Sequence, residues 1–532
     1  MKTALFSIIL FLLVSAWCQV RGNAPMPGRD TSVVQRASYS AIYLDSLVLE
    51  QFIRSRVPDA DGANRLRNFY NSRNYQYAWF TKDGLAEQAH AFWNLQQNYI
   101  RLSQDSLLFD SALAASMKAF VSDDTLNTKP SSEFTELSLT LHFFKYAVHA
   151  YSGRINPKEL QWYIPRKTVN EMDLLDSLIA NKGQRLENWE PVNRQYTLME
   201  KYLEQYNRLE LRKPSDTIEF SRKMVLRDGD SSRVITEIKK RLTALNDYVS
   251  TDTSAVYNPG LIAAVTQFQK RHGLKQHGII NFSFVKALNV PARKRIRQML
   301  INMERIRWLP KEPPGNLIVA NIPEYKLRVF EGPDKVLDMD IIVGKTANKT
   351  IIFNDILQYV VFSPYWNVPA SIVKNEILPA MQNNSNYLSS KNMEVMGYSG
   401  GIPVVRQNPG TGNSLGLVKF IFPNDYNIYF HDTPAKTLFA EESRAFSHGC
   451  IRLAAPEQLA TYLLRDQPAW TRERIRKAMH GSEEIWVKVK FPNPVVITYF
   501  TTWVDKEGLL NFRDDVYGHD KRMAGLLFES QE

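Results

Sequence analysis

Two short segments near the end of the chain carry residue types suited to nucleophilic catalysis. The first is His431-Asp432-Thr433-Pro434, and the second runs Ser447-His448-Gly449-Cys450-Ile451-Arg452. A free thiol is mostly protonated at neutral pH, so a catalytic cysteine needs a base or an electric field that favours the thiolate. His431 can be that base if the fold returns the chain across the strand that His431 ends. The pattern therefore predicts Cys450 as a nucleophile and His431 as its base.

The cysteine content supports the same hypothesis. The 532 residues include Cys18 and Cys450 as the only cysteines, and Cys18 lies in or beside a predicted signal peptide. The mature chain would then keep one thiol with no partner for an internal disulfide. Because exported proteins usually pair their cysteines or lack them, a lone thiol is a candidate nucleophile. An inert buried cysteine is the alternative.

Residues 1–22 have the layout of a secretory signal peptide. Lys2 supplies the positive end, and the run from Ala4 to Ser15 is almost entirely apolar. This run is short for a membrane span, so we expect an exported protein, with a membrane anchor retained at the N-terminus as the alternative. Trp17 precedes Cys18 where a lipoprotein signal requires a small residue, which argues against lipidation.

The composition indicates a globular protein of two or three domains. Hydrophobic residues make up 44% and charged residues 23% of the chain, which excludes a disordered or fibrous protein. The formal net charge of +11 suits an anionic partner. Nucleic acid is disfavoured as this partner, because no long Lys/Arg tract is interleaved with aromatic residues.

Helical periodicity dominates the first part of the chain. Residues 38–220 are predicted as a helical domain, and the clearest amphipathic run extends from Phe134 to Tyr151. His142 and His149 share one face of this helix but lie two turns apart, too far to bind one metal ion. We expect packing or surface roles for them, and no metal site.

A small helical unit and a connecting helix follow. Residues 225–290 have the apolar spacing of a three-helix bundle, with Ser232 as the first N-cap. Residues 291–315 are predicted as a linker helix that presents a basic, solvated face.

From Asn316 the apolar period changes to two, which is typical of strands. Residues 316–505 are therefore predicted as a mainly-β domain. About residues 370–405 interrupt the pattern with helical and loop character, as an insertion over the sheet would, and residues 506–532 are predicted as a C-terminal tail. The expected strands are Leu317–Ile322, Leu327–Phe330, Leu337–Val343, Tyr359–Phe362, Val418–Phe422, Asn427–His431, Ile485–Val489 and Val495–Thr501.

The Ser-His-Gly-Cys run with a distant His before it resembles the active-site signature of the L,D-transpeptidases, whose catalytic domain has the YkuD-type fold. Other segments resemble the large periplasmic members of this family: Asn321-Ile322-Pro323, Val343-Gly344-Lys345, Pro364 to Pro369 and Phe430 to Thr433. Thr350-Ile351 departs from the Thr-Pro that the family commonly has after Val-Gly-Lys. The run from Val265 to Leu274 resembles the peptidoglycan-binding domain of cell-wall hydrolases, although any small helical bundle is the alternative.

This resemblance implies a multidomain fold. Its parts would be an α-helical scaffold domain, a small three-helix peptidoglycan-binding-like bundle, and a mainly-β L,D-transpeptidase catalytic domain with an α/loop capping insertion.

The resemblance also implies catalytic roles. Cys450 would be the nucleophile and His431 the general base, oriented by the backbone carbonyl of Asp432. His448 and Gly449 would lie beside the oxyanion site, where backbone N–H groups stabilise the tetrahedral intermediate. A triad role for the Asp432 carboxylate is the alternative.

Four further residues are expected to bind substrate. Arg452 would contact substrate carboxylates, with Ser447 beside it. Tyr365 and Trp366 would line the donor cleft. Arg452 could instead pair with an acid of the chain, and the two aromatic residues could instead belong to a core.

The implied reaction is 3→3 cross-linking of peptidoglycan in cell-wall biogenesis and cell shape. A tetrapeptide stem would acylate the cysteine, and a neighbouring stem would accept the acyl group, without a metal or organic cofactor. The resemblance further implies the periplasm of a Gram-negative bacterium, other cell-wall synthesis proteins as partners, and sensitivity to carbapenems. The alternatives are an L,D-carboxypeptidase or endopeptidase, a protein that attaches or releases wall-linked proteins, and a non-catalytic peptidoglycan-binding scaffold. The intact Ser-His-Gly-Cys motif argues against the last.

Overall fold

The computed structural model describes residues 40–122, 130–164, 166–184, 190, 192–212, 217–311 and 315–528. By their contacts they form two compact units, one within residues 1–151 and 169–190 and the other within residues 152–168 and 191–532. The predicted signal peptide, with Cys18, lies outside the described residues. The predicted helical domain is divided between the two units, because residues 152–168 and 191–220 belong to the second.

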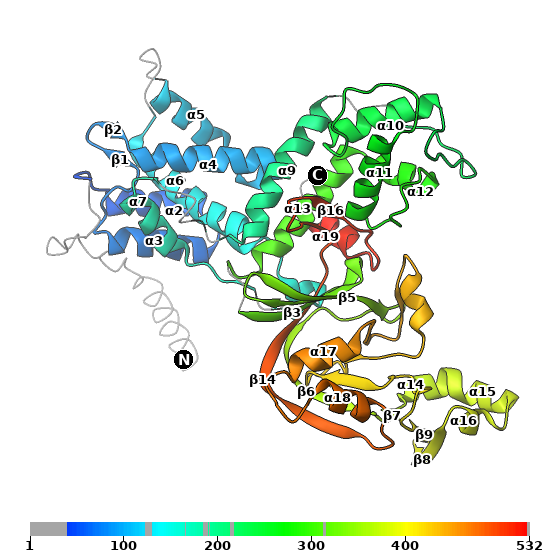
Figure 1. Ribbon diagram of the computed structural model, residues 1–532. Helices are drawn as coiled ribbons and strands as arrows, with labels where there is room; N and C mark the ends of the chain where they lie inside the picture. The colour runs from blue at the N-terminus through cyan, green and yellow to red at the C-terminus, as the bar shows by residue number, and fades with distance from the viewer. Residues whose placement is uncertain are drawn as a thin grey trace, which may run out of the picture. The chain divides into compact units, whose positions relative to one another are not determined.

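The first unit is mostly helical (Figure 1). Its helices are α2 (Ser46–Arg56), α3 (Ala60–Ser72), α4 (Glu87–Ser103), α5 (Ser111–Val121), α6 (Ser132–Ala147) and α7 (Glu171–Ala180), with a hairpin of β1 (Phe80–Thr81) and β2 (Gly84–Leu85). Helix α6 is buried on nearly all sides.

His142 and His149, which share one face in the sequence pattern, have separate partners. His142 on α6 lies 3.0 Å from the Gln96 amide, and His149 lies 2.7 Å from a carboxylate oxygen of Asp105. Both therefore have the structural roles that their spacing predicted.

The predicted three-helix bundle is present in the second unit. It consists of α10 (Arg233–Ala244), α11 (Pro259–Arg271) and α12 (Phe282–Leu288). Ser232 accepts a hydrogen bond from the Val234 N–H and so caps α10, and Asn258 caps α11 in the same way. The apolar side chains of the three helices share one core: Ile235, Ile238, Leu242, Leu261, Val265, Phe268, Phe284, Val285 and Leu288.

The mainly-β domain is built on one nine-stranded sheet. Its strands are β3 (Asn316–Asn321), β4 (Lys326–Glu331), β5 (Asp334–Gly344), β6 (Asn354–Phe362), β10 (Val418–Ile421), β11 (Phe430–His431), β12 (Ala445–Ser447), β13 (Ile451–Leu453) and β14 (Ile485–Thr498). They follow the order β12-β5-β13-β11-β10-β6-β14-β3-β4, and β4 pairs again with β5, which closes the sheet. The two last strands expected from the sequence are one continuous strand, β14.

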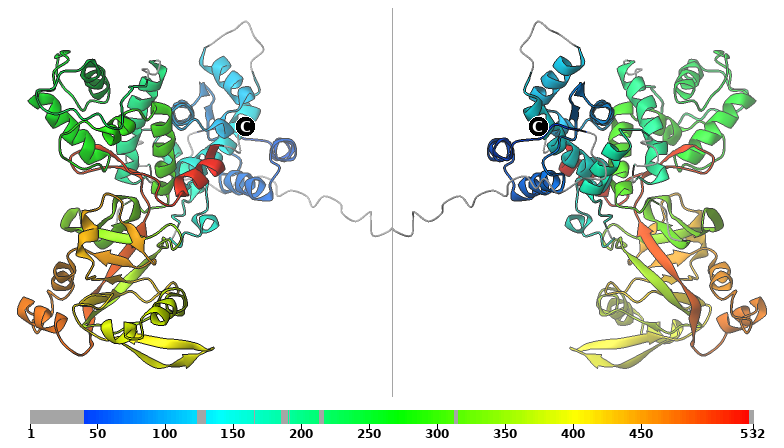
Figure 2. Two further views of the ribbon diagram at one scale, coloured as in Figure 1. Left: turned by 90° about the vertical axis from the view of Figure 1, so that its right-hand side faces the viewer. Right: turned by 90° about the vertical axis from the view of Figure 1, so that its left-hand side faces the viewer.

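The insertion has its own secondary structure. Its helical part contains α14 (Ala370–Ile372), the π-helix η5 (Val373–Ile377), α15 (Leu378–Asn383) and α16 (Tyr387–Ser390). The sequence analysis expected helix and loop here, but β8 (Met393–Ser399) and β9 (Ile402–Gln407) form a hairpin that pairs with β7 (Trp366–Asn367). This hairpin, yellow in Figure 2, extends away from the nine-stranded sheet. Its turn uses Gly400 and Gly401, both with positive φ, which glycine adopts readily.

The predicted linker helix is instead a buried helix, α13 (Ala292–Arg307). Arg293 and Lys294 are exposed, as expected, but every side chain from Met299 to Arg307 is buried. Ion pairs compensate the buried charges: Arg305 bonds to Asp520 at 2.7 Å, and Arg307 bonds to Glu304 at 2.8 Å. Asp520 is distant in sequence, which is why the pattern alone indicated a solvated face.

The predicted C-terminal tail is also part of the folded unit. It forms the second strand of a hairpin, β15 (Thr502–Val504) with β16 (Leu510–Phe512), and a final helix, α19 (His519–Phe528). Tyr517, Met523 and Leu527 belong to the same core as the sheet. These few apolar residues had no long periodic pattern that could have predicted their burial.

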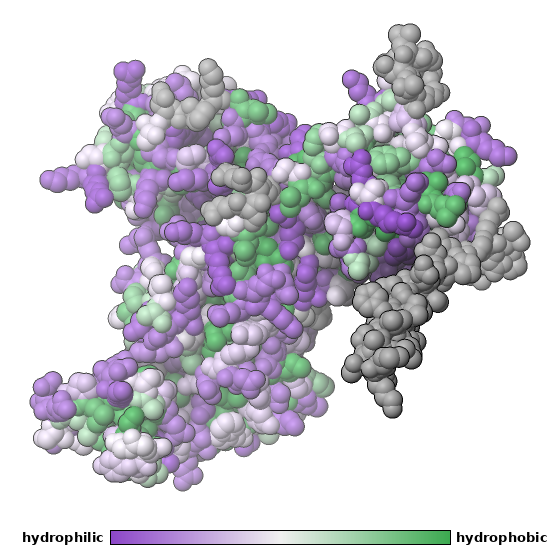
Figure 3. All heavy atoms as spheres, turned by 180° about the vertical axis from the view of Figure 1, so that it is seen from behind, coloured by the Kyte–Doolittle hydropathy of each residue, from purple (hydrophilic) through white to green (hydrophobic). Residues whose placement is uncertain are grey.

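Polar side chains cover most of the face shown in Figure 3, and apolar ones gather over the insertion. The exposed apolar residues of its hairpin are Val395, Met396, Tyr398 and Val404. Within the described parts of the chain, no helix is both long and apolar enough to cross a membrane.

Because α19 packs into the main core, a substitution that leaves a cavity there should lower the free energy of unfolding. Met523→Ala should lower the free energy of unfolding by about 3 kcal/mol, because the Met523 side chain is fully buried in the main core. Urea denaturation followed by tryptophan fluorescence measures the change. Lys521→Ala, at an exposed position of the same helix, is the control and should change stability by less than about 0.5 kcal/mol. Equal effects of the two substitutions would show that α19 is not part of the core.

Candidate active site

The Ser447–Cys450 turn connects β12 to β13 and is held by its own serine. The Ser447 hydroxyl donates to the Cys450 carbonyl at 2.5 Å and accepts from the Gly449 N–H at 3.2 Å. Ser447 is buried, so its structural contact is with the turn rather than with the surface where substrate would bind. Gly449 has φ of +123°, a conformation that side chains other than glycine rarely adopt.

The Cys450 side chain is half-buried. Its sulfur lies 3.5 Å from the carbonyl oxygen of Asn427. Burial raises the pKa of the thiol, while hydrogen bonds from Tyr429 and the charge of Arg452 act in the opposite direction. Because burial is the larger effect, the resting group at neutral pH is a thiol and not a thiolate.

His431 reaches the site through the pairing of β11 with β13. The two strands are parallel, with Phe430 opposite Ile451 and His431 opposite Arg452. The chain therefore returns across the strand that His431 ends, as the proposed chemistry requires. The rings of His431 and Tyr429 lie 5.8 Å apart, which places Tyr429 beside both the imidazole and the thiol.

The protonation of His431 follows from its surroundings. The Nδ1–H donates to the carbonyl oxygen of Asp432 at 2.5 Å, so Nε2 carries the lone pair. Burial, followed by the charge of Arg452, lowers the pKa of His431 to about 4. The imidazole is consequently neutral at pH 7 and able to accept a proton. Among the described residues, no hydrogen bond joins it directly to the Cys450 sulfur.

The Asp432 carboxylate bonds to Leu417 and Lys436. One oxygen accepts from the Leu417 N–H at 2.9 Å, and the other bonds to the Lys436 ammonium at 2.5 Å. Gly416, with φ of +63°, packs so closely on this carboxylate that a Cβ would collide with it. The geometry thus gives the carbonyl of Asp432, and not its carboxylate, the contact with His431.

Arg452 pairs with no acidic residue among those that the structure describes. Within the described part of the chain its guanidinium forms no ion pair, and its buried Nε has no hydrogen bond. Burial lowers the pKa of Arg452, and the nearby Cys450 opposes this shift. The alternative in which Arg452 pairs with an acid of the chain therefore finds no support, and the charge is available to an anionic ligand.

His448 connects the turn to the insertion. Its Nε2 lies 2.8 Å from a carboxylate oxygen of Glu376 on η5. Both side chains are partly exposed, at 36% and 51%. The Gly449 N–H is already bonded to Ser447, whereas the N–H groups of His448 and Cys450 have no hydrogen bond to any described residue. These two are the free backbone donors of the turn.

Tyr365 and Trp366 lie where the insertion leaves the sheet. The Arg406 guanidinium stacks 4.4 Å above the Tyr365 ring, and the Tyr365 N–H donates to Glu484 at 3.1 Å. Trp366 packs against the small apolar core of the insertion. Trp366 is only partly buried in this packing, so its place in the donor cleft stays a prediction.

Residues that no sequence motif marked brace the turn from outside. The Thr350 hydroxyl donates to the Gly449 carbonyl at 2.7 Å and accepts from the Gly344 N–H at 2.9 Å. It therefore links the end of β5 to the Ser447–Cys450 turn. The departure from Thr-Pro at positions 350–351 was the one signal that pointed to this loop.

Tyr517 completes this bracing. Its hydroxyl donates to the Gly344 carbonyl at 2.6 Å and accepts from the Thr350 N–H at 3.3 Å. The Lys349 ammonium bonds to the Tyr517 carbonyl at 2.8 Å. No motif marked Tyr517, because its partners lie more than 150 residues earlier in the chain.

Three family models match separate parts of the chain. Residues 315–495 match the L,D-transpeptidase catalytic domain (YkuD), residues 64–203 match a scaffold domain, and residues 231–288 match a "Putative peptidoglycan binding domain". The Ser447–Cys450 turn, with β11 and β13 beside it, lies inside the first match.

A curated protein of Haemophilus influenzae, named "Putative L,D-transpeptidase", is 29% identical to this chain over 297 residues. The match covers 52% of this chain and 59% of the relative, so the chain spans less than two thirds of the length of that protein.

Solved L,D-transpeptidase structures from Mycobacterium smegmatis and Stackebrandtia nassauensis also match, each with 14% identity and a TM-score of 0.20. The first match covers 35% of this chain and 58% of that chain, and the second covers 54% and 97%. The three family models and the curated relative confirm the resemblance seen in the sequence: the chain carries a catalytic domain of the L,D-transpeptidase family, together with a scaffold domain and peptidoglycan-binding helices.

Proposed function

We propose that this protein is a peptidoglycan L,D-transpeptidase that forms 3→3 cross-links through a thioester on Cys450. One observation carries the proposal: the Cys450 thiol lies next to the strand of a neutral His431 and beside the Arg452 guanidinium, which no described carboxylate pairs. A stem peptide supplies both a carbonyl for the thiol and carboxylates for the guanidinium.

In the first half-reaction the Cys450 sulfur attacks the carbonyl at the L-centre of the diamino acid in a tetrapeptide stem. Nε2 of His431 takes the thiol proton, since Nδ1 is bound to the Asp432 carbonyl. The N–H groups of His448 and Cys450 are the donors free to stabilise the oxyanion. The amide bond to the terminal D-Ala then breaks, and the D-Ala nitrogen receives the proton from His431.

In the second half-reaction the side-chain amine of a neighbouring stem attacks the thioester. His431 accepts a proton from this amine as the new amide forms, and the Cys450 sulfur leaves and is protonated again. Both half-reactions use one nucleophile and one base, and neither requires a metal or an organic cofactor. Attack by water in place of the amine would make the same site an L,D-carboxypeptidase or endopeptidase.

The proposed setting is outside the cytoplasm, in the periplasm of a Gram-negative bacterium. The signal-like pattern of residues 1–22 supports export, and a retained N-terminal anchor would keep the protein at the membrane. The net charge of +11 suits the acidic wall polymer. Other cell-wall synthesis proteins are proposed partners.

The reaction products test this function. Incubation with a purified disaccharide-tetrapeptide should give a cross-linked dimer with loss of D-Ala, and mass spectrometry resolves it from the other products. Cys450→Ala, with unchanged circular dichroism, should give none, because the acyl group then has no sulfur to bind. Tripeptide as the sole product would show a hydrolase, and no product from the wild type would favour a binding scaffold.

The protonation of His431 predicts the acid side of the pH profile. Because the pKa of His431 is lowered from 6.5 to about 4, kcat/KM should stay level as the pH falls below 6.5 and decline only near pH 4. Stability behaves differently: the unfolded imidazole binds a proton first, so the stability contributed by His431 falls between pH 6.5 and about 4. Rates measured over short times separate the two effects. An acid limb near pH 6.5, or thiolate absorbance at pH 7, would contradict this protonation state.

The bracing of the turn predicts a difference between two similar substitutions. Thr350→Val keeps the size but leaves the Gly449 carbonyl and Gly344 N–H without their partner, so kcat should fall about tenfold with little change in KM. Thr350→Ser keeps the hydroxyl and should stay within about twofold of the wild type. Tyr517→Phe removes the second hydroxyl and should lower kcat in the same direction. Equal kcat values for the valine and serine variants would exclude a positioning role for Thr350.

A further inference from the structure

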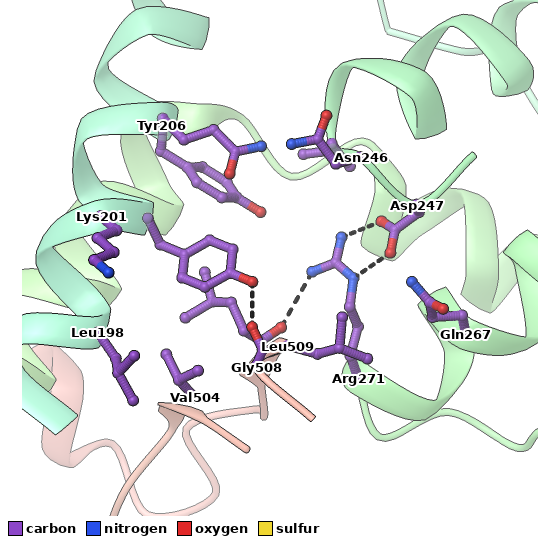
Figure 4. Close-up of a pocket in the computed structure, with 14 residues that line it drawn as sticks. Leu198, Lys201, Tyr206, Asn246, Asp247, Gln267, Arg271, Val504, Gly508 and Leu509 are labelled. Atoms are coloured by element: carbon purple, nitrogen blue, oxygen red, sulfur yellow. Dashed lines mark hydrogen bonds and ion pairs between the residues drawn. The ribbon is translucent and has the colours of Figure 1, made fainter. Parts of the chain in front are cut away.

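Two adjoining cavities lie along the three-helix bundle, far in sequence from Cys450. The first, of about 350 Å³, is lined by fourteen residues of four separate segments and is drawn in Figure 4. The second, of about 590 Å³, is lined by residues 247–250 and by residues of the segment 258–267. Both include Asp247 and Gln267 in their walls, so the two cavities meet there and form one groove along α11.

One wall of this groove does not belong to the bundle. Helix α9 (Arg194–Leu211) contributes Tyr202, Gln205 and Tyr206, and the β15–β16 hairpin contributes Leu509. The Tyr202 hydroxyl donates to the Gly508 carbonyl at 2.5 Å and so ties α9 to the hairpin. The match to the peptidoglycan-binding model ends at residue 288 and includes neither segment.

The charges deep in the groove cancel. The Arg271 guanidinium holds both carboxylate oxygens of Asp247, at 2.7 Å for the Nε contact, and a further N–H of Arg271 donates to the Leu510 carbonyl at 3.3 Å. Both side chains are buried. Lys201, on the exposed rim, is the one other charged residue in the two linings.

Uncharged polar groups are free to bind a ligand. The carboxamides of Gln205, Asn246 and Gln267 form no hydrogen bond with any described residue, so each offers two donors and an acceptor to a ligand. Figure 4 shows Asn246 and Gln267 around the cavity with the ring of Tyr206. Tyrosine rings beside carboxamides suit a ligand with both apolar faces and many hydroxyl or amide groups.

We infer that this groove binds the glycan strand of peptidoglycan, with α9 and the β15–β16 hairpin completing a site that the bundle alone does not form. This inference rests on the proposed function for the identity of the polymer. An N-acetylated polysaccharide is uncharged, extended and rich in hydroxyl and amide groups, which fits a long groove with neutral polar walls. A stem peptide carries carboxylates and an amine, for which the groove offers only Lys201 at its rim.

The test uses the whole chain and a defined probe, the β-1,4-linked tetramer of N-acetylglucosamine. Isothermal titration calorimetry should show binding by the wild type. Gln267→Ala, at the junction of the two cavities, and Gln205→Ala, on α9, should each weaken binding about three- to tenfold, as loss of one or two hydrogen bonds would. Gln458→Ala removes an exposed glutamine of α17 (Pro456–Leu463), away from both linings, and should bind like the wild type.

Three outcomes would overturn the inference. The first is that the wild type does not bind the tetramer, and the second is that Gln458→Ala weakens binding as much as Gln267→Ala does. The third is that the protein binds the tetrapeptide but not the tetramer, and that Gln267→Ala abolishes the tetrapeptide binding. Wild-type affinity of Gln205→Ala would overturn the part assigned to α9. Covalent acylation of Cys450 by a carbapenem, measured by mass on the same samples, tests the proposed function separately. Glycan binding without acylation would leave the groove in place and remove the transpeptidase, and acylation without glycan binding would do the reverse.

Discussion

The parallel pairing of β11 with β13 is the constraint on which the active site depends. These strands are only two and three residues long, yet their register places His431 opposite Arg452, which is two residues after Cys450. Each lies between longer or better-connected neighbours, β10 on one side and β5 on the other. Since β5 also pairs with β4 and β12, the closed sheet holds the proposed nucleophile and the proposed base without long strands of their own.

The His431 ring is oriented by the backbone carbonyl of Asp432 and not by a carboxylate, and this has an electrostatic consequence. A carboxylate beside His431 would raise the pKa of the imidazole and would attract the Arg452 guanidinium. Because the Asp432 carboxylate instead binds Leu417 and Lys436, the imidazole remains neutral and Arg452 remains unpaired among the described residues. The same arrangement that prepares the base therefore leaves a positive charge for an anionic ligand.

Features that depend on neighbouring residues could be predicted from the sequence, whereas contacts between residues far apart in the chain could not. Ser232 caps its helix as expected, and the change to period two marks the β domain, because both effects act between near neighbours. The Ser-His-Gly-Cys run likewise forms one compact turn between two short strands, as a local motif can. The burial of α13 could not be predicted in this way, since the acid that compensates Arg305 is Asp520. The contact of His448 with Glu376 depends on an insertion whose hairpin the sequence pattern also concealed.

The Ser447–Cys450 turn is supported by Thr350 and Tyr517, which are distant from it in sequence, and this support has a physical reason. Gly449 has a positive φ and no side chain, so the turn has few contacts of its own that could hold the His448 and Cys450 N–H groups in one direction. Oxyanion donors stabilise a transition state only if they are oriented before the charge develops. Thr350 and Tyr517 supply this orientation through backbone groups at both ends, Gly449 on the turn and Gly344 on β5. The folded C-terminal segment therefore contacts the loop that braces the Ser447–Cys450 turn, although the family match ends at residue 495.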